Sequence, residues 1–223
     1  NLNTSFESIR IIASLVSLSK EITTLIVPGP IDDLLNESIP LATEILNEFG
    51  SGTNIRKHNF NFSDIFESIE SRPEEEGSTN EEVKRVATFF TGGVDSFFTL
   101  FKNKSEITDV IFVHGLDISL EDKVVRKEIS GRLKKICAEL NLNLIELETN
   151  LRSLYKNFNI HWELAHGNAL GAIAHFLDNY LKKVCIPSSF YYKDIFPWGS
   201  HPSLDYLWST TKLEILHDGW EFN

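Results

Sequence analysis

Cysteine, methionine and basic residues are scarce in this chain of 223 residues. It has two cysteines and no methionine, and its 21 basic residues are outnumbered by 32 acidic ones, for a formal net charge of -11. Cys137 and Cys185 have no C-x-x-C spacing and match no zinc pattern, which argues against a disulfide framework or a cysteine-ligated metal. We expect both to be small buried hydrophobes in a reducing compartment, so the predicted location is cytoplasmic.

The shortage of basic residues bears on the partner class. Lysines pair only in short steps, Lys134-Lys135 and Lys182-Lys183, within otherwise mixed segments. A surface that holds a phosphate backbone needs clustered Lys and Arg. We therefore expect no nucleic-acid partner.

A long hydrophobic run is also missing. The most apolar early stretch, residues 11–18 (IIASLVSL), is broken by serines and flanked by Glu7 and by Lys20-Glu21. This pattern favours an amphipathic helix over a signal peptide, and we expect no membrane segment. A chain that starts at Asn1 without methionine is expected to continue upstream.

The composition changes at one place, the acidic, Pro- and Gly-containing stretch around residues 73–82. We interpret 73–82 as a linker or exposed loop between a small α/β module at 1–72 and a larger domain at 83–223. A charged surface loop inside one domain is the alternative. The first part is expected to contain helices at 6–22 and 31–50, with Pro40 as a candidate break, and strands at 23–29 and 55–62.

The second part alternates regularly between apolar strands and helices. The pattern predicts strands at 85–91, 109–115, 143–148, 183–187 and 212–218, and helices at 95–103, 120–141 and 163–181. Near-continuous apolar strands separated by helices indicate a parallel sheet covered on both faces. The predicted class is therefore α/β, with a five-stranded parallel sheet sandwiched by helices and ligands bound beyond the carboxyl ends of the strands.

The hexad TGGVDS, residues 91–96, joins the first of these strands to a helix. Two adjacent glycines there let the main chain approach an anion, and the backbone N–H groups and helix dipole would attract it. The hydroxyls of Thr91 and Ser96 can add hydrogen bonds, and Asp95 can hold a metal ion or cap the helix. The lysine of the Walker motif is absent. A tight structural turn is the alternative interpretation.

The hexad resembles the PP-loop S-G-G-x-D-S of the N-type ATP pyrophosphatases, a HUP-type family also called adenine nucleotide α hydrolase-like, with Thr91 in place of the first serine. The resemblance covers the part after residue 82, and the C-terminal stretch resembles bacterial relatives of the family. It implies a Rossmann-like domain with ATP and Mg²⁺ as cofactors, Mg²⁺ at Asp95, and a nucleotide-binding loop formed by Thr91, Gly92, Gly93, Val94, Asp95 and Ser96. It also implies attack of a substrate oxygen on the α-phosphate, release of pyrophosphate, and displacement of AMP by a nitrogen or sulfur nucleophile.

Other strand ends supply further candidates. The resemblance implies nucleoside contacts after the second strand, at His114, Gly115 and Asp117, although His114 is equally consistent with a strand-end residue bonded to a loop. Asn150 is a candidate substrate contact. Arg152 is a candidate catalytic clamp for phosphate or carboxylate, with a surface arginine as the alternative.

The helix that begins near residue 163 supplies further candidate ligand contacts. His166 and Gly167 are expected to contact the nucleotide, and Asn168 is a further candidate ligand contact. His175 lies farther along an apolar face and is expected to be a core histidine.

Residues 188–212 form a long connection rich in aromatic, hydroxyl, Gly and Pro residues, which is typical of a substrate-binding loop. Candidate substrate residues in it are Trp198, Gly199, Ser200, His201 and Asp205, with His201 also catalytic and with Tyr191 and Trp208 as further pocket walls. Burial of these aromatics in a homodimer interface is the alternative. A metal held by His201, Asp205, His217 and Asp218 fits no zinc template.

These observations favour an ATP-dependent enzyme that adenylates a small-molecule substrate and then transfers the activated group to a nitrogen or sulfur nucleophile. A nucleotide-binding module without turnover is one alternative. A tRNA-modifying or sulfur-transferring enzyme of the same family is another, disfavoured by the acidic charge and by the lack of a paired or exposed cysteine.

Overall fold

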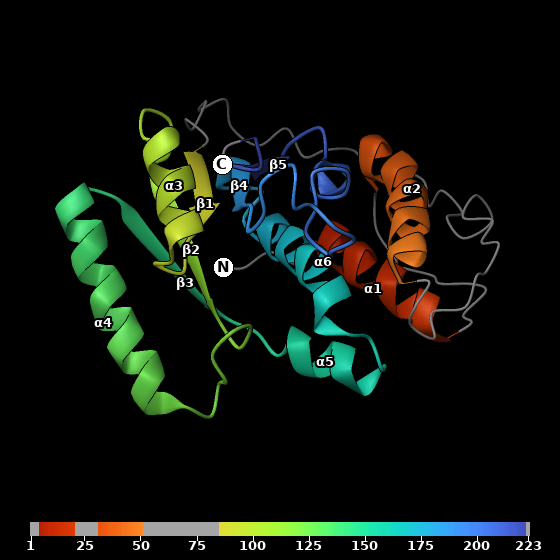
Figure 1. The fold of residues 1–223 in the computed structure, drawn as a ribbon, viewed down its shortest axis with the longest axis horizontal. Coiled ribbons are helices and arrows are strands. Elements are labelled where there is room, and N and C mark those ends of the chain that lie inside the picture. Colours follow the sequence, from red (N-terminus) through yellow and green to blue (C-terminus); the bar gives the residue numbers. More distant parts are fainter. Residues whose placement is uncertain (1–4, 21–30, 51–84, 222–223) are drawn as a thin grey trace, which may run out of the picture.

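The computed structural model describes residues 5–20, 31–50 and 85–221. Within them, five strands form one all-parallel sheet with the order β3-β2-β1-β4-β5 (Figure 1). The strands are β1 (Arg85–Phe89), β2 (Asp109–His114), β3 (Asn143–Glu148), β4 (Leu181–Pro187) and β5 (Glu214–Asp218). The chain adds strands outward from β1 on one side and then returns to add β4 and β5 on the other. The predicted α/β class with a Rossmann-like five-stranded parallel sheet is confirmed.

Helices cover both faces of this sheet (Figure 1). Those described are α1 (Phe6–Lys20), α2 (Asp33–Phe49), α3 (Val94–Lys102), α4 (Lys123–Leu140), α5 (Leu151–Asn157) and α6 (Trp162–His175), with a short 3-10 helix, η2 (Asp205–Trp208). The predicted helices exist with shifted ends, and α6 stops at His175, six residues before its predicted end at 181. The seven-residue α5 was not predicted.

Successive side chains of each strand point to opposite faces of the sheet, and this divides the core into two layers. Val86 and Phe90 of the first strand segment pack with Leu133 and Cys137 of α4, on the face that α3 and α4 cover. Ala87 and Phe89 project to the opposite face, where α5, α6 and the N-terminal helices pack. Period-two alternation of this kind follows from strand geometry and decides which side chains can reach which helix.

The described helices of the first segment belong to the same core as the sheet. Ile11 of α1 and Leu35 of α2 are fully buried in the cluster that also contains Ala169 of α6 and Ile215 of β5. The helix α1 lies along α6 (Figure 1), and Ser8 Oγ donates to the carbonyl of Ala172 at 2.7 Å. The strands predicted at 23–29 and 55–62 and the linker at 73–82 lie outside the described residues, so the division of the chain into modules stays a prediction.

The predicted break at Pro40 is wrong. The helix α2 runs through Pro40, although proline removes one backbone hydrogen bond from a helix interior. Its neighbours Ile39, Ala42 and Leu46 are buried in the core, so packing outweighs the local cost. Asp32 begins the helix by accepting from the N–H groups of Leu34 and Leu35.

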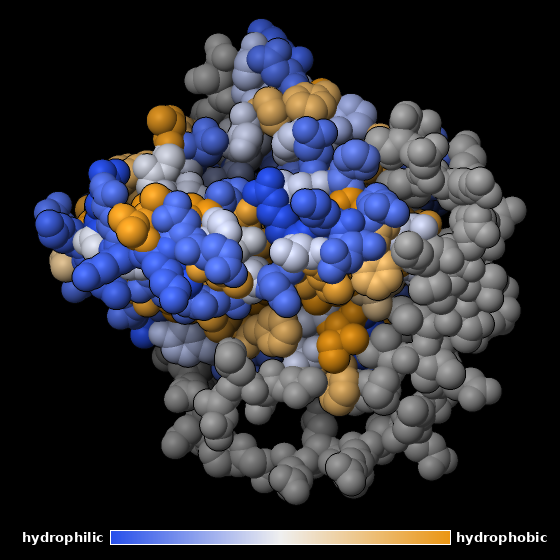
Figure 2. Space-filling model, turned by 90° about the horizontal axis from the view of Figure 1, so that it is seen from below, coloured by the Kyte–Doolittle hydropathy of each residue, from blue (hydrophilic) through white to orange (hydrophobic). Residues whose placement is uncertain are grey.

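Both cysteines are free and buried, as expected. Burial raises the pKa of the Cys185 thiol to about 12, so this side chain acts as a small hydrophobe. None of the described helices is long and apolar enough to cross a membrane. The side of the molecule seen in Figure 2 is mostly hydrophilic where it is described, with hydrophobic residues in separate groups.

Candidate functional site

A cavity of about 250 Å³ lies at the carboxyl ends of the strands. Its walls come from the β1–α3 junction, the ends of β2, β4 and β5, the start of α6 and the connection after β4. The sheet order reverses between β1 and β4, which is where ligands bind in open parallel sheets. The volume is near the lower limit for small-molecule sites, roughly 300 Å³.

The glycine loop opens directly onto this cavity. Gly92 has φ +79, in the left-handed region that favours glycine. Gly93 is the N-cap residue of α3, and no side chain from the described part of the chain caps the helix there. Because the first N–H groups of a helix have no intrahelical partner, the exposed turn at Gly93, Val94 and Asp95 offers backbone donors to an anion.

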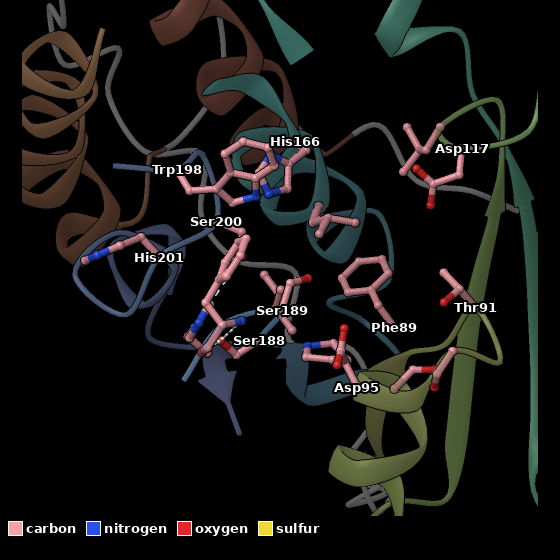
Figure 3. A pocket seen from close by; sticks show the side chains of 18 of the residues that line it. Phe89, Thr91, Asp95, Asp117, His166, Ser188, Ser189, Trp198, Ser200 and His201 are labelled. Atoms are coloured by element: carbon pink, nitrogen blue, oxygen red, sulfur yellow. Dashed lines mark hydrogen bonds between the residues drawn. The ribbon is translucent and has the colours of Figure 1, made fainter. Parts of the chain in front are cut away.

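Side chains of the loop take different parts in this arrangement. Thr91 and Asp95 are exposed and line the cavity. Ser96 is buried, and its hydroxyl donates to the carbonyl of Gly93 at 2.8 Å, which braces the turn. Asp117, from the turn after β2, is the second carboxylate of this side (Figure 3).

Opposite Thr91 and Asp117, Figure 3 shows Trp198, Ser200 and His201 from the connection after β4. Asp205 is fully buried, and its Oδ2 accepts from Ser200 Oγ at 2.6 Å and from His217 Nδ1 at 2.7 Å. His201 is half-buried, and its Nδ1 accepts from the N–H of Ser203 at 3.0 Å. Burial lowers the pKa of His201, and nearby His217 lowers it further.

Aromatic rings form the outer wall. Phe196 lies 4.6 Å from Phe190 and 5.3 Å from Trp198, measured between ring centroids. Trp198 in turn lies 5.2 Å from His166, whose Nδ1 is 3.3 Å from the carbonyl of Trp162. Burial lowers the pKa of His166, so its neutral form is favoured near neutral pH.

The cavity brings together nine of the predicted site residues: Thr91, Gly93, Asp95, Ser96, Asp117, His166, Trp198, Ser200 and His201. The others do not line it: Gly92, Val94, His114, Gly115, Asn150, Arg152, Gly167, Gly199 and Asp205, and neither do the expected further walls Tyr191 and Trp208. Gly92 and Val94 still belong to the loop. Asp205 is hydrogen-bonded to Ser200 and His217, which both line the cavity.

The structure places His114 on the wrong face of the sheet for the predicted nucleoside contact. It is 4% exposed and lies toward α4, with Nε2 3.3 Å from Glu146 Oε1 and 3.4 Å from Ser130 Oγ. Gly115 follows with φ +94, and a Cβ there would lie 1.9 Å from the carbonyl oxygen of Thr149. His114 therefore connects β2 to β3 and α4, and Gly115 lies against the backbone that follows β3.

Two of the predicted glycines serve close packing. A Cβ at Gly167 would lie 2.0 Å from the carbonyl oxygen of Gly199, and Gly199 donates its N–H to Glu163 O at 2.7 Å. The connection after β4 thus passes directly against the backbone of α6. This contact positions Trp198 and Ser200 at the cavity, whereas neither glycine lines it.

Arg152 and Asn150 stand outside the cavity. The exposed Arg152 donates to the carbonyl of Leu116 and lies over the Trp162 ring, 5.1 Å from its centroid. It can brace two wall segments, but the structure does not bring it to the cavity as the predicted catalytic clamp. Asn150 is exposed at the start of α5.

Two further expectations for α6 had opposite outcomes. Asn168 was expected near the ligand, but it is fully buried between Tyr155 Oη at 2.6 Å and the carbonyl of Ile11 at 2.7 Å. His175 is a core histidine as predicted, with Nε2 2.7 Å from the carbonyl of Trp208.

Sequence reasoning missed Ser188, Ser189 and Phe190, and it considered His217 only as a metal ligand. All four line the cavity. Each follows or ends a strand at the carboxyl edge of the sheet, so a systematic search of every strand end would have found them.

The described residues contain no group of three or more His, Cys, Asp or Glu side chains that could hold a metal ion. In the set of His201, Asp205, His217 and Asp218, the last residue projects away from the others and accepts from Lys102 at 2.9 Å and Asn103 at 3.1 Å. A metal at Asp95 would therefore need its other ligands from a bound molecule or water.

No protein-family model matches this chain, and no curated protein or solved structure matches it either.

Proposed function

We propose that this chain binds ATP with Mg²⁺ through residues 91–96 and transfers the adenylyl group to a small-molecule substrate with release of pyrophosphate. A nitrogen or sulfur nucleophile would then displace AMP. The observation that carries the proposal is the uncapped first turn of α3, which borders the cavity directly after the central strand β1. The resemblance of residues 91–96 to the PP-loop supports the same ligand.

The charges around the cavity support a metal-dependent mode of binding. Among the described residues that line it, none is Lys or Arg, whereas Asp95 and Asp117 are both acidic. Triphosphate bound there would rely on backbone N–H groups and on a divalent cation for neutralisation. Asp95 is the exposed carboxylate of the loop and would hold Mg²⁺, which lowers the charge on the leaving pyrophosphate.

The chain's own contribution would be positioning. In the proposed reaction a substrate oxygen forms a bond to the α-phosphorus, the bond to the pyrophosphate oxygen breaks, and pyrophosphate leaves with the electron pair. Backbone donors and the hydroxyl of Thr91 would hold the departing group, while Ser96 braces the turn through Gly93. Such preorganised donors can stabilise the transition state without a protein nucleophile.

The first test is the identity of the nucleotide products. Protein incubated with ATP and Mg²⁺ is expected to release AMP and pyrophosphate in equal amounts, resolved by ion-exchange chromatography. Production of ADP and phosphate would contradict the proposed bond cleavage. Binding of Mg²⁺-ATP by calorimetry without any product would leave two interpretations, a requirement for the missing substrate and a nucleotide-binding module.

Two variants locate the activity in the loop. Gly93→Ala is expected to weaken Mg²⁺-ATP binding at least about tenfold, because a methyl group would obstruct close approach of an anion to the main chain. Strain is not expected, since that Cβ would meet Thr91 Oγ1 at 3.4 Å. Gly131→Ala, where a Cβ meets nothing within 4 Å, is the matched control and should bind normally. Asp95→Asn should raise the Mg²⁺ concentration required.

A further inference from the structure

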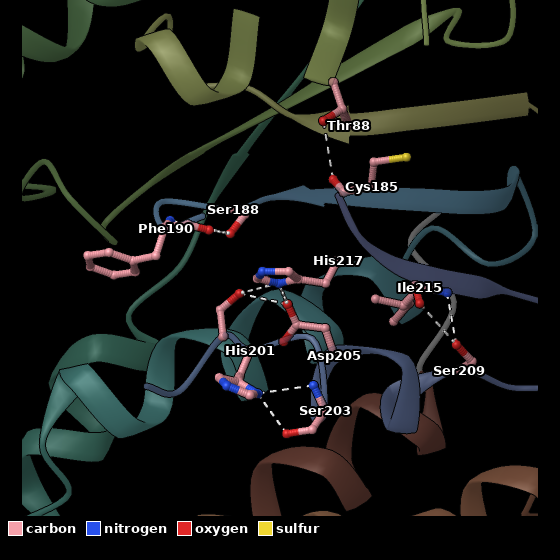
Figure 4. Close-up of polar contacts among 11 residues, drawn as sticks. Thr88, Cys185, Ser188, Phe190, His201, Ser203, Asp205, Ser209, Ile215 and His217 are labelled. Atoms are coloured by element: carbon pink, nitrogen blue, oxygen red, sulfur yellow. Dashed lines mark hydrogen bonds and ion pairs between the residues drawn. The ribbon is translucent and has the colours of Figure 1, made fainter. Parts of the chain in front are cut away.

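His217 is a polar residue of the cavity with one buried ring nitrogen that lacks a partner among the described residues. Its side chain is 5% exposed, it lines the cavity, and its Nε2 is buried with no hydrogen-bond partner among the described residues. Figure 4 shows the ring with Nδ1 joined to Asp205 and the other nitrogen on the side of Ser188 and Phe190, which also line the cavity. A buried polar atom without a partner is destabilising unless a bound molecule pairs with it, and this one belongs to a residue that lines the cavity.

The bond to Asp205 decides which nitrogen carries the proton. A carboxylate only accepts, so Nδ1 of His217 donates to Asp205 Oδ2 across 2.7 Å. In the neutral ring this leaves a bare lone pair on Nε2. Asp205 is 0% exposed and would stabilise the imidazolium that forms when Nε2 takes up a proton.

Ser200 does not complete a nucleophilic triad. Its Oγ donates to Asp205 Oδ2 at 2.6 Å and lies 3.4 Å from Nδ1 of His217, not beside Nε2. A nucleophilic serine would have to give its proton to the unprotonated nitrogen. Ser200 therefore orients the carboxylate, and the free nitrogen is available to a bound molecule.

Several charged or titratable groups surround His217. Asp205 and His201 approach from the connection after β4, and His166 of α6 is close enough to Asp205 for that carboxylate to raise its pKa against the effect of burial. On the other face of β5, Asp218 is paired with Lys102. Of the charged or titratable groups named here, Asp205 is hydrogen-bonded to the His217 ring.

We propose that His217 is a catalytic base of this cavity and Asp205 its positioning residue. Nε2 takes a proton from an O–H or N–H group of the second substrate, which keeps the electron pair and becomes the better nucleophile. The proton stays on the imidazolium, paired with Asp205, until it passes to solvent. This inference rests on the proposed function. The second substrate is either the molecule that ATP adenylates or the nucleophile that then displaces AMP.

The cavity also limits the chemical class of that substrate. The described lining offers no Lys or Arg to pair with a carboxylate, and aromatic rings make up much of the wall: Phe89, Phe90, Phe112, Trp162, Phe190, Phe196 and Trp198. Such walls favour flat, weakly polar rings. We therefore expect a substrate with a flat, weakly polar ring, no carboxylate, and an ionisable N–H or O–H group.

Nitrogen NMR of the histidine rings tests the site without reference to ATP. In protein labelled with ¹⁵N-histidine, the signals absent from His217→Gln identify His217. They are expected to show the Nδ1–H form with an unprotonated Nε2. The Asp205→Asn variant is expected to populate the Nε2–H form, because an amide holds the Nδ1 proton less strongly than a carboxylate. An Nε2–H form in the unmodified protein would overturn the assignment.

Kinetics separate this inference from the proposed function. With water as the O–H donor, His217→Gln is expected to slow AMP release about 100-fold or more, in the range of general-base effects. Its Kd for Mg²⁺-ATP should stay within about twofold of the unmodified protein, since β4 separates β5, which carries His217, from β1, which leads into the loop. Exposed His161→Gln is the control and should retain full activity.

Unchanged AMP release by His217→Gln would overturn the role of His217 and leave the nucleotide site standing. Loss of Mg²⁺-ATP binding by this variant would also overturn it, because the residue would then serve nucleotide binding. Failure of the unmodified protein to bind Mg²⁺-ATP would instead contradict the proposed function, while the NMR result would still report on the Asp205–His217 pair.

Discussion

At the scale of single residues, burial opposes protonation of the core histidine His175. His175 is 0% exposed, and its Nε2 donates to the carbonyl of Trp208, while Nδ1 has no partner among the described residues. Burial is the largest cause that lowers its pKa below the ordinary value of 6.5. The folded protein thus resists protonation at a residue that the unfolded chain protonates freely.

The pH dependence of stability follows from this difference. As the pH falls below about 6.5, the unfolded chain takes up a proton at His175 that the folded protein does not, so the free energy of unfolding decreases. One such proton contributes a slope of up to about 1.4 kcal/mol per pH unit. His175→Gln, which keeps a donor for Trp208, should flatten the slope between roughly pH 6.5 and pH 5 in urea unfolding experiments.

The exposed His161 provides the control for this measurement, and His161→Gln should keep the original slope. His166 and His201 also have lowered pKa values through burial, so part of the slope should survive in His175→Gln. Identical slopes for the unmodified protein and His175→Gln would contradict the argument from burial.

At the scale of secondary-structure elements, two helical glycines differ in their surroundings, so one reports on helix stability and the other on packing between segments. Gly131 lies in the middle of α4 on an exposed side, and none of the described residues has an atom within 4 Å of a prospective Cβ. Gly167 lies in α6 against the backbone of Gly199, at a distance that no side chain can tolerate. The same substitution should therefore have opposite effects in the two helices.

Gly131→Ala is expected to stabilise the protein by about 0.5–1 kcal/mol, because alanine loses less backbone entropy in a helix. Gly167→Ala is expected to destabilise it by about 1–3 kcal/mol, because the connection after β4 must move away from α6. Urea unfolding followed by circular dichroism measures both. Equal changes in the two variants would show that the contact between Gly167 and Gly199 is not a constraint.

Across the whole molecule, the N-terminal helices and the sheet share one hydrophobic core. Leu35 of α2 and Trp208 of η2 are both fully buried and belong to the same cluster as Ile215 of β5. This connects the first described segment to the wall that carries Asp205, which lies in the same 3-10 helix as Trp208. A single core predicts a single cooperative unfolding transition.

Leu35→Ala is expected to lower the free energy of unfolding by about 2–5 kcal/mol, the usual range for a buried leucine truncated to alanine. Tryptophan fluorescence and far-ultraviolet circular dichroism should shift together in urea, since Trp208 shares the core with Leu35. Exposed Leu41→Ala in the same helix is the control and should change stability little. A separate transition seen by circular dichroism alone would instead indicate an independent N-terminal unit.

Local patterns were sufficient for the order and type of most elements. The apolar runs of β1 and β2 and the spacing in α4 predicted the parallel sheet, because burial on both faces requires continuous apolar strands. They did not predict α5, whose seven residues carry only Leu151 and Tyr155 as buried positions. A helix this short gives too little periodicity to recognise.

The candidate site shows the same contrast between features that the sequence predicted and features that only the folded structure revealed. By itself, the sequence determined the glycine loop after β1, since its two glycines and the following helix are adjacent residues with one shared geometry. Only the tertiary structure decided that His114 lies toward α4, that Asn168 belongs to the core, and that His217 pairs with Asp205. Periodicity determines whether a residue is buried, but the partner it meets there depends on how distant segments pack.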